Sequence, residues 1–365
     1  MPPVVVRILH PGPDPAAGSL GAWVQDVRGR LAEHQRRGFM EAGAEEVTIV
    51  SGPPDGQPFG DRLRDLIGPR RRVPGGLVVL GSGSIPLATG ADRRALVSAA
   101  GRDDRGALAN NYFSADVVAI SRIDSLPAIP ALPSDNALPR WLDEVAGYPV
   151  EDLRRRWRLG FDIDGPLDLV LLGLGAPAKV DLGLVNSRLT AFRAAASDPR
   201  AELVVSGRTS ATALGWLGRH AVGRIRAWVE ERGLQASSPL AQAGRPAADP
   251  SLRTRPPRSL LGALLDRDGP DALGAHLARF ADAALIDTRV LLAHRAGIDP
   301  SGWPSPEDRA ASDLLLADRI ADPWLRELTS SAADASIPIL LGGHTLVGPG
   351  VRLAVGGPPA KLPWT

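Results

Sequence analysis

Short apolar runs alternate with longer stretches of helical spacing along the first half of the chain. The runs, whose β-branched and leucine content is typical of buried strands, lie at residues 4–9, 47–50, 77–80 and 116–121. The stretches with helical spacing lie at residues 20–42, 57–68, 92–100 and 140–146. This alternation predicts an α/β fold with a mostly parallel sheet and flanking helices.

The second half has the same mixture of elements, but helices predominate. Predicted strands lie at residues 203–206, 285–292 and 337–341. Predicted helices lie at residues 184–196, 212–232, 259–266, 272–283, 307–320 and 323–333. A stretch at 237–258, rich in proline, alanine, serine and arginine, is typical of a mobile loop. We expect a first domain at residues 1–178 and a helix-rich α/β domain of unknown role at residues 179–365.

Length and composition narrow the class of protein. A chain of 365 residues with 44% apolar and 23% charged residues is long enough for two domains with substantial cores. No stretch approaches the roughly 20 consecutive apolar residues that cross a bilayer, so we expect no membrane association. The first residues carry no basic segment followed by an apolar run, which favours a cytoplasmic location. Composition does not fix the oligomeric state.

Net charge and cysteine content narrow the possible partners and chemistries further. The formal net charge is +1 and the charges of both signs alternate, so no nucleic-acid partner is indicated. The chain has no cysteine, which rules out disulfides, thiolate nucleophiles and zinc-thiolate sites. Lysine occurs only at Lys179 and Lys361. A bound phosphate would therefore depend on arginine, backbone amides or a metal.

Two closely spaced acids give the strongest chemical signal. Asp162 and Asp164 stand two apart at a predicted strand end, and alternating residues of a strand share one face. Carboxylates crowded in this way repel unless a cation lies between them, and Mg²⁺ prefers such oxygen ligands. The alternative is a capped turn, because Pro166 can open a turn and Asp168 can cap the next segment.

Three sequence features resemble one enzyme superfamily. Residues 161–169, Phe-Asp-Ile-Asp-Gly-Pro-Leu-Asp-Leu, are similar to an Asp-x-Asp-Thr-Pro-x-Asp-Leu motif. The helix at 20–42 ends in Ala-Gly-Ala before the next strand, and the third strand enters Ser-Ile-Pro-Leu at 84–87. These features resemble the nucleotidyltransferases of the nucleotide-diphospho-sugar transferase superfamily, especially guanylyltransferases that act on phospholactate or molybdopterin. The resemblance covers roughly residues 1–175.

The resemblance implies a reaction and a set of site residues. It implies transfer of a nucleoside monophosphate from a nucleoside triphosphate to a small phosphorylated metabolite, with Mg²⁺ held by Asp162 and Asp164. The glycine-rich loops expected to approach the nucleotide contain Gly12, Gly18, Gly81, Ser82, Gly83 and Ser84. The polar residues expected to contact the base or the acceptor are Asn110, Asn111, Asp135 and Asn136. Paired asparagines also hold turns through bonds to the backbone, which is the alternative for the first two.

Departures from the family pattern leave a second function open. The loop at 11–18 has three prolines and no basic residue for a triphosphate. Ser84 stands where the family has a metal-binding acid, and a neutral hydroxyl is a weaker magnesium ligand. The alternative function is a non-catalytic nucleotide- or metabolite-binding protein that retains the scaffold.

Other segments carry weaker signals. Residues 204–210, with Arg208, and residues 340–350, with His344, could present backbone amides to an anion, or form a helix cap and a glycine turn. Residues 152–158 place arginines around Trp157, as a phosphate site or as a solvated helix face. The sequence lacks the motifs of zinc hydrolases, serine hydrolases and dinucleotide-binding dehydrogenases.

Overall fold

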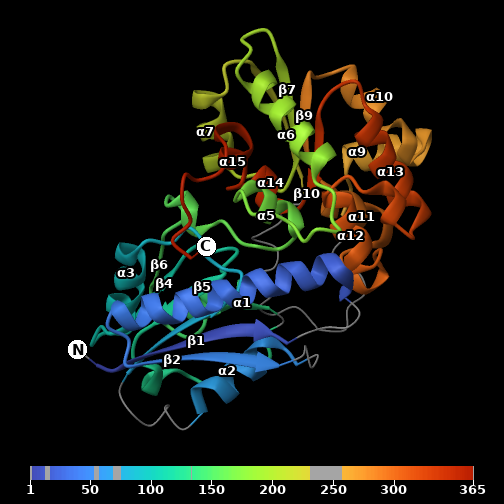
Figure 1. Ribbon diagram of the computed structural model, residues 1–365. Helices are drawn as coiled ribbons and strands as arrows, with labels where there is room; N and C mark the ends of the chain where they lie inside the picture. Colours follow the sequence, from blue (N-terminus) through green and yellow to red (C-terminus); the bar gives the residue numbers. More distant parts are fainter. Residues whose placement is uncertain are drawn as a thin grey trace.

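The computed structural model describes residues 2–12, 17–52, 57–68, 75–132, 134–230 and 257–364. Two sheets with flanking helices make up the protein, one built from the first half of the chain and one from the second (Figure 1). The predicted α/β fold is confirmed. The division into domains at residue 178 stays a prediction.

The first sheet has six strands in the order β2-β1-β3-β5-β4-β6. Its strands are β1 (Val4–Pro11), β2 (Glu46–Gly52), β3 (Gly76–Gly81), β4 (Ala107–Ala109), β5 (Val117–Ile120) and β6 (Val150–Asp152). β1 is parallel to β2 and β3, β4 is parallel to β6, and β5 is antiparallel to both of its neighbours. The sheet is mostly parallel, as predicted, but the sequence pattern did not reveal β4 and β6 or the reversed direction of β5.

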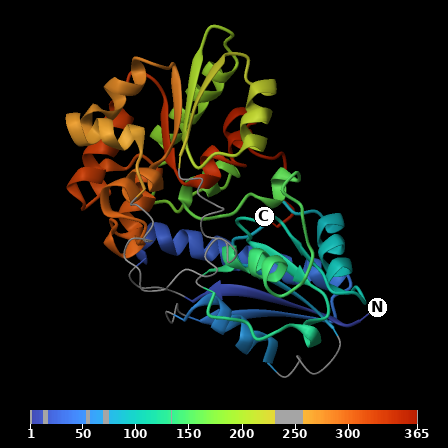
Figure 2. The same ribbon diagram turned by 180° about the vertical axis from the view of Figure 1, so that it is seen from behind.

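The helices of the first half include one that reaches both sheets. These helices are α1 (Gly18–Glu41), α2 (Phe59–Ile67), α3 (Gly90–Ala100), α4 (Leu138–Glu144) and α5 (Pro166–Leu171). Along α1, the buried Leu20, Trp23, Val24, Val27 and Leu31 recur at helical spacing. They pack into the core of the second half, while the later Ala32 and Phe39 pack against the first sheet. Figures 1 and 2 show α1 running between the two sheets.

The second sheet is entirely parallel, in the order β10-β9-β7-β8. Its strands are β7 (Glu202–Gly207), β8 (Arg224–Val229), β9 (Ala283–Asp287) and β10 (Ile339–Gly342). The accompanying helices are α6 (Gly183–Ala196), α7 (Ala211–His220), α9 (Leu260–Asp268), α10 (Leu273–Ala278), α11 (Thr288–Ala296), α12 (Pro306–Asp313), α13 (Pro323–Asp334), α14 (His344–Val347) and α15 (Val351–Gly356).

Four predicted elements of the second half are wrong in type or length. The helix expected at 272–283 ends at Ala278, and β9 begins at Ala283. The helix expected at 212–232 ends at His220, and β8 follows it, because Gly223 lies against the backbone of Ala201 and turns the chain into the sheet. The strand expected at 285–292 ends at Asp287, whose carboxylate caps α11. The helix expected at 307–320 ends at Asp313. The loop expected at 237–258 lies almost entirely outside the described residues.

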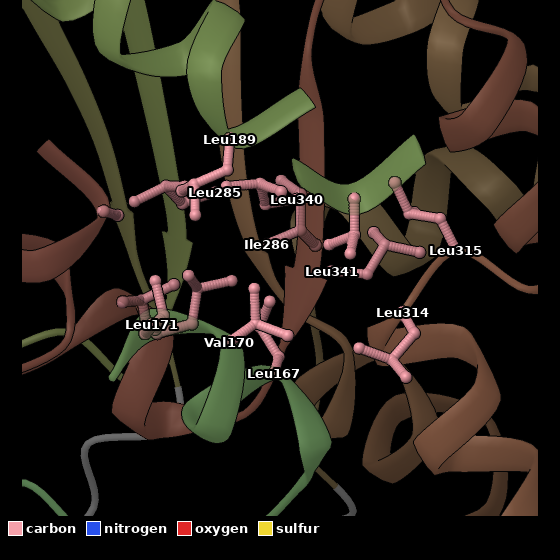
Figure 3. Close-up of a cluster of buried hydrophobic side chains, with 14 of the residues drawn as sticks. Leu167, Val170, Leu171, Leu189, Leu285, Ile286, Leu314, Leu315, Leu340 and Leu341 are labelled. Atoms are coloured by element: carbon pink, nitrogen blue, oxygen red, sulfur yellow. The ribbon is translucent and has the colours of Figure 1, made fainter. Parts of the chain in front are cut away.

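The core of the second half extends into the segment that carries the acidic pair. Leu167, Val170 and Leu171 of α5 point toward Ile286 of β9 and Leu341 of β10 (Figure 3). The side chains of all five residues are buried. This packing fixes α5, and therefore the residues just before it, against the carboxyl ends of the second sheet.

None of the helices within the described residues is both long and apolar enough to span a membrane.

Candidate functional site

The opening glycine-rich loop has an acid at the position expected for a phosphate. Gly12 donates its N–H to the Gly52 carbonyl at 2.7 Å, and residues 13–16 lie outside the described residues. Gly18 has a positive φ of 66°, and a Cβ there would lie 2.5 Å from the Glu307 carboxyl group. Glu307 accepts the Leu20 N–H at 3.1 Å, so its carboxylate already interacts with the positive end of α1.

The turn after β3 is buried beneath the acidic segment. Ser82 donates its N–H to Leu9 at 2.8 Å, and its hydroxyl lies 3.0 Å from Nδ1 of His10. A Cβ on Gly83 would lie 2.8 Å from the Ile163 carbonyl, so only glycine lets the two segments approach this closely. Ser84 forms an isolated antiparallel bridge with Asp162. Gly81, Ser82, Gly83 and Ser84 therefore bring β3 against the acidic pair.

The acidic pair does not end a strand, so that prediction is wrong. The strand-like pairing of Asp162 is limited to a single bridge with Ser84, and the chain then turns directly into α5. Asp168 accepts the N–H groups of Asp164 and Gly165, each at 2.8 Å, which is the capped turn that the sequence offered as an alternative. The cap orders the acidic segment without using the carboxyl groups of the pair, which share a hydrogen bond with each other.

The two acids of the pair have opposite electrostatic environments. Burial, with the nearby Asp164 and Asp116, raises the pKa of Asp162 well above its ordinary value. The buried Oδ1 of Asp162 has no hydrogen-bond partner among the described residues. Burial alone would raise the pKa of Asp164, but the nearby His344 and Arg28 outweigh this effect and lower that pKa below its ordinary value. Asp164 lies 3.5 Å from His344 Nδ1 and 3.6 Å from the Arg28 guanidinium.

Side chains from the carboxyl ends of the second sheet face this pair. His344 follows β10, Asp287 ends β9, and Arg208 follows β7. Arg208 donates to the fully buried Asp287 carboxylate at 2.7 and 3.1 Å. Because β1 and β3 end on the other side of the acidic pair, the carboxyl edges of the two sheets meet here. Such edges are where ligands bind in α/β proteins.

A buried ion pair supports the turn at Gly165. Arg289 of α11 forms a two-pronged pair with Asp313 of α12, with one contact at 2.7 Å, and it also donates to Thr288 at 2.8 Å. A Cβ on Gly165 would lie 2.9 Å from an Asp313 oxygen. The ion pair therefore forms the wall against which the acidic turn packs.

The paired asparagines hold local structure. Asn110 donates to Asp116 at 2.8 Å and to the Leu159 carbonyl at 2.9 Å, and its own oxygen accepts the Asp116 N–H at 2.9 Å. Asn111 accepts the Phe113 N–H at 3.0 Å. Both residues also line a cavity, so these bonds do not remove them from the candidate site.

Asp135 and Asn136 lie next to an acid that the sequence analysis did not single out. Asp135 accepts the Asn136 N–H at 2.9 Å, and burial raises the pKa of Asp135. Burial also raises the pKa of Asp116 to about 8, with Asp164 and Asp135 adding to the effect and the Asn110 hydrogen bond opposing it. The carboxylates of the first half therefore form one interacting cluster with the acidic pair.

Two cavities adjoin at Asp116 and Ser134. The smaller, of about 260 Å³, lies at the carboxyl ends of the first sheet between Leu9, Gly81 and Asp135. The larger, of about 1180 Å³, extends from Asn110, Asn111 and Asn136 to Arg208 and His344 of the second half. The four residues predicted to contact the base or acceptor, and Gly81, thus line one continuous region, whereas the acidic pair Asp162 and Asp164, Gly12, Gly18 and the buried turn residues Ser82 to Ser84 line neither cavity.

Residues 152–158 do not form the solvated helix face that was one expectation. They run from β6 through a turn, and Arg156 and Arg158 donate to Asp92 of α3 at 2.8–3.0 Å. The Asp92 side chain is fully buried and also caps α3 together with Thr89. These arginines therefore fasten the connection between the halves.

The donor atoms near the acidic pair limit which metal could bind. Within the described ranges, no three histidine, cysteine, aspartate or glutamate side chains gather as a metal-binding group. Two carboxylates alone are too few for a protein cage of zinc or calcium. They fit Mg²⁺, which is commonly held by one or two carboxylates together with substrate phosphates and water. The unpartnered Asp162 oxygen is the observation in favour of that fit; it lies in the buried turn beside Gly83, and neither acid lines either cavity.

Comparison with known sequences gives no family: no protein-family model matches the chain, and no curated protein matches it. Function is therefore argued from the site.

Several residues of the site escaped the sequence analysis. Asp116 was included in a strand, although an acid at the edge of an apolar run is a usable signal. Asp287 was hidden inside the overlong strand at 285–292, where Asp-Thr-Arg could have indicated a helix cap. Arg28, Arg289 and Asp313 carry no local signal, because their partners lie far away in sequence.

Proposed function

We propose that this protein is a nucleotidyltransferase-like protein of the cytoplasm. It binds a nucleoside triphosphate at the carboxyl edge of the first sheet and, with Mg²⁺ at Asp162 and Asp164, transfers the nucleoside monophosphate to a small phosphorylated metabolite. The alternative is a non-catalytic protein that binds a nucleotide or metabolite on the same scaffold.

One observation carries the proposal: the acidic pair stands where the carboxyl ends of two sheets meet, and Asp164 contacts His344, which lines the larger cavity. The bridge between Asp162 and Ser84 joins the pair to β3, and the contact between Asp164 and His344 joins it to β10. The smaller cavity, at the ends of β1 and β3, supports binding of a flat apolar group such as a base, with Asp135 as a hydrogen-bond acceptor.

The transfer has a simple chemical balance. A phosphate oxygen of the acceptor forms a bond to the α-phosphorus, and the bond from that phosphorus to the bridging oxygen breaks as pyrophosphate leaves. Magnesium would neutralise charge on the phosphates and on the leaving pyrophosphate. In this proposal Asp162 and Asp164 hold the cation, while Arg28, 3.6 Å from Asp164, supplies fixed positive charge beside it.

A specific observation favours the non-catalytic alternative. The Glu307 carboxylate accepts the Leu20 N–H in the first turn of α1, where the family resemblance implies triphosphate binding. A carboxylate at this position repels phosphate. Arg319 pairs with the Glu307 carboxylate at 2.8 Å. A protein with this arrangement would bind the base and ribose and have weaker contacts with the phosphates.

A pyrophosphate-release screen separates the two functions. The four common nucleoside triphosphates are offered with Mg²⁺ and a panel of small phosphorylated acceptors, beside thermal-shift measurements with the same ligands. Release that is lost in Asp162→Asn/Asp164→Asn and retained in the exposed control Asp318→Asn supports transfer. A thermal shift without pyrophosphate release supports the binding protein. If the wild type shows neither release nor a thermal shift, both proposed functions are contradicted.

A further inference from the structure

Arginines predominate among the charged residues that line the larger cavity. Four arginines line it, Arg140, Arg154, Arg208 and Arg352, together with His344. Among the described residues, the lining has one carboxylate, that of Asp116, and burial raises its pKa to about 8, so it carries little negative charge near neutral pH. A cavity with this balance attracts anions.

One of these arginines differs from the others in its partners. Arg154 pairs with Asp152 at 3.0 Å, Arg208 pairs with Asp287, and Arg140 also interacts with other groups of the protein. The Arg352 guanidinium has no hydrogen bond or ion pair with any residue that the structure describes. Burial and the nearby Arg219 lower the pKa of Arg352, as expected for a cation without a counter-charge.

Aromatic rings hold the Arg352 guanidinium in place. It lies 5.0 Å from the ring centre of Trp157 and 5.1 Å from that of Trp216. Trp216 in turn stacks on His220, with ring centres 4.2 Å apart and an angle of 12° between the planes. Such stacking restrains the guanidinium while its N–H donors remain available. A restrained planar fork suits phosphate and carboxylate oxygens.

The rest of the lining is apolar enough to hold the body of an organic molecule. Phe113, Leu132, Trp141, Val145 and Pro349 contribute to the wall. The volume of about 1180 Å³ exceeds what a bare inorganic ion requires. The two kinds of wall together suit a molecule with an apolar part and an anionic end.

We infer that this cavity binds a small organic anion whose phosphate or carboxylate group accepts hydrogen bonds from Arg352. The assignment goes beyond the proposed transfer, because a non-catalytic protein would bind the same anion. Trp157 belongs to the connection after the first sheet, whereas Trp216 and Arg352 belong to the second half. The bound anion would therefore contact both halves of the protein.

Isothermal titration without nucleotide or magnesium tests this site separately from the proposed transfer. The probes are phenyl phosphate, benzoate and the neutral benzyl alcohol, which share an apolar ring and differ in the polar group. The variants are Arg352→Gln, Arg352→Lys and the control Arg326→Gln, which changes an exposed arginine of α13 outside the cavity. Circular dichroism checks that each variant folds.

The wild type is expected to bind at least one of the two anions at least tenfold more tightly than benzyl alcohol, and the stronger anion identifies the preferred group. Arg352→Gln should weaken that binding at least tenfold, Arg352→Lys should be intermediate, and Arg326→Gln should match the wild type. If Arg352→Gln does not fold, Arg352→Lys decides. Unchanged affinity in the folded Arg352 variants, equal binding of the alcohol, or no anion binding by the wild type would overturn the assignment.

Discussion

Replacing Asp313 by alanine should destabilise the protein strongly, because it leaves a buried cation without its partner. The Asp313 side chain is 3% exposed and that of Arg289 is 18% exposed. Breaking a buried ion pair costs about 3–5 kcal/mol. The hydrogen bond from Arg289 to Thr288, and the nearby Asp287 and Asp168, remain in the variant. We therefore expect Asp313→Ala to lower the free energy of unfolding by about 3 kcal/mol, near the lower end of that range.

Urea denaturation, followed by circular dichroism, measures this loss in free energy of unfolding. Asp198→Ala is the matched control, because it breaks the exposed pair with Arg200 and should change stability little. The double variant Arg289→Met/Asp313→Leu removes both charges and should recover most of the loss. A single variant as stable as the control, or a double variant as unstable as the single one, would refute the reasoning.

Three further predictions concern single side chains. Asp92→Asn should lower the free energy of unfolding by about 1.5–3 kcal/mol, because it weakens charge-assisted hydrogen bonds. These bonds outweigh burial and hold the pKa of Asp92 below its unfolded value, so wild-type stability should fall as pH drops below about 4. Urea denaturation from pH 2 to 6 should give a flatter pH profile for the variant. The raised pKa of Asp116, about 8, has the opposite sign: the folded state holds a proton that the unfolded state releases near pH 4, so stability should fall between about pH 4 and 8, and Asp116→Asn should reduce that fall in thermal melts. Gly83→Ala should lower the free energy of unfolding by about 1–3 kcal/mol, because its Cβ would lie 2.8 Å from the Ile163 carbonyl. Gly175→Ala is the matched control, because its φ is not positive and its Cβ would meet open space, so it should not lower the stability.

The sequence pattern predicted those helices and strands that are determined by the residues within them. The alternation of apolar runs and helical spacing located β1, β3, β7 and α1 closely, because each buries a face that the sequence displays. Where one element passes directly into another, the pattern was continuous and the boundary was missed. Apolar residues stand at both ends of 285–292, and the polar Asp287, Thr288 and Arg289 between them mark the point where the strand gives way to the capped helix.

The site was predictable only in part, for a physical reason. The spacing of Asp162 and Asp164 is visible in the sequence, but the environment that separates their pKa values comes from Arg28 and His344, which are distant along the chain. The contact of Glu307 with the start of α1 likewise joins residues 287 positions apart. Such contacts are set by packing of the two sheets and leave no local trace.

The proposed function requires that a nucleotide and magnesium bind at the acidic pair between the two sheets. Titration of each nucleoside triphosphate into the wild type, Asp162→Asn/Asp164→Asn and Asp318→Asn, with and without Mg²⁺, tests this binding. We expect at least one nucleotide to bind, and Mg²⁺ to strengthen its binding in the wild type and in Asp318→Asn but not in the double variant. Binding that is equal in all three proteins and indifferent to Mg²⁺, or no binding by the wild type, would contradict it.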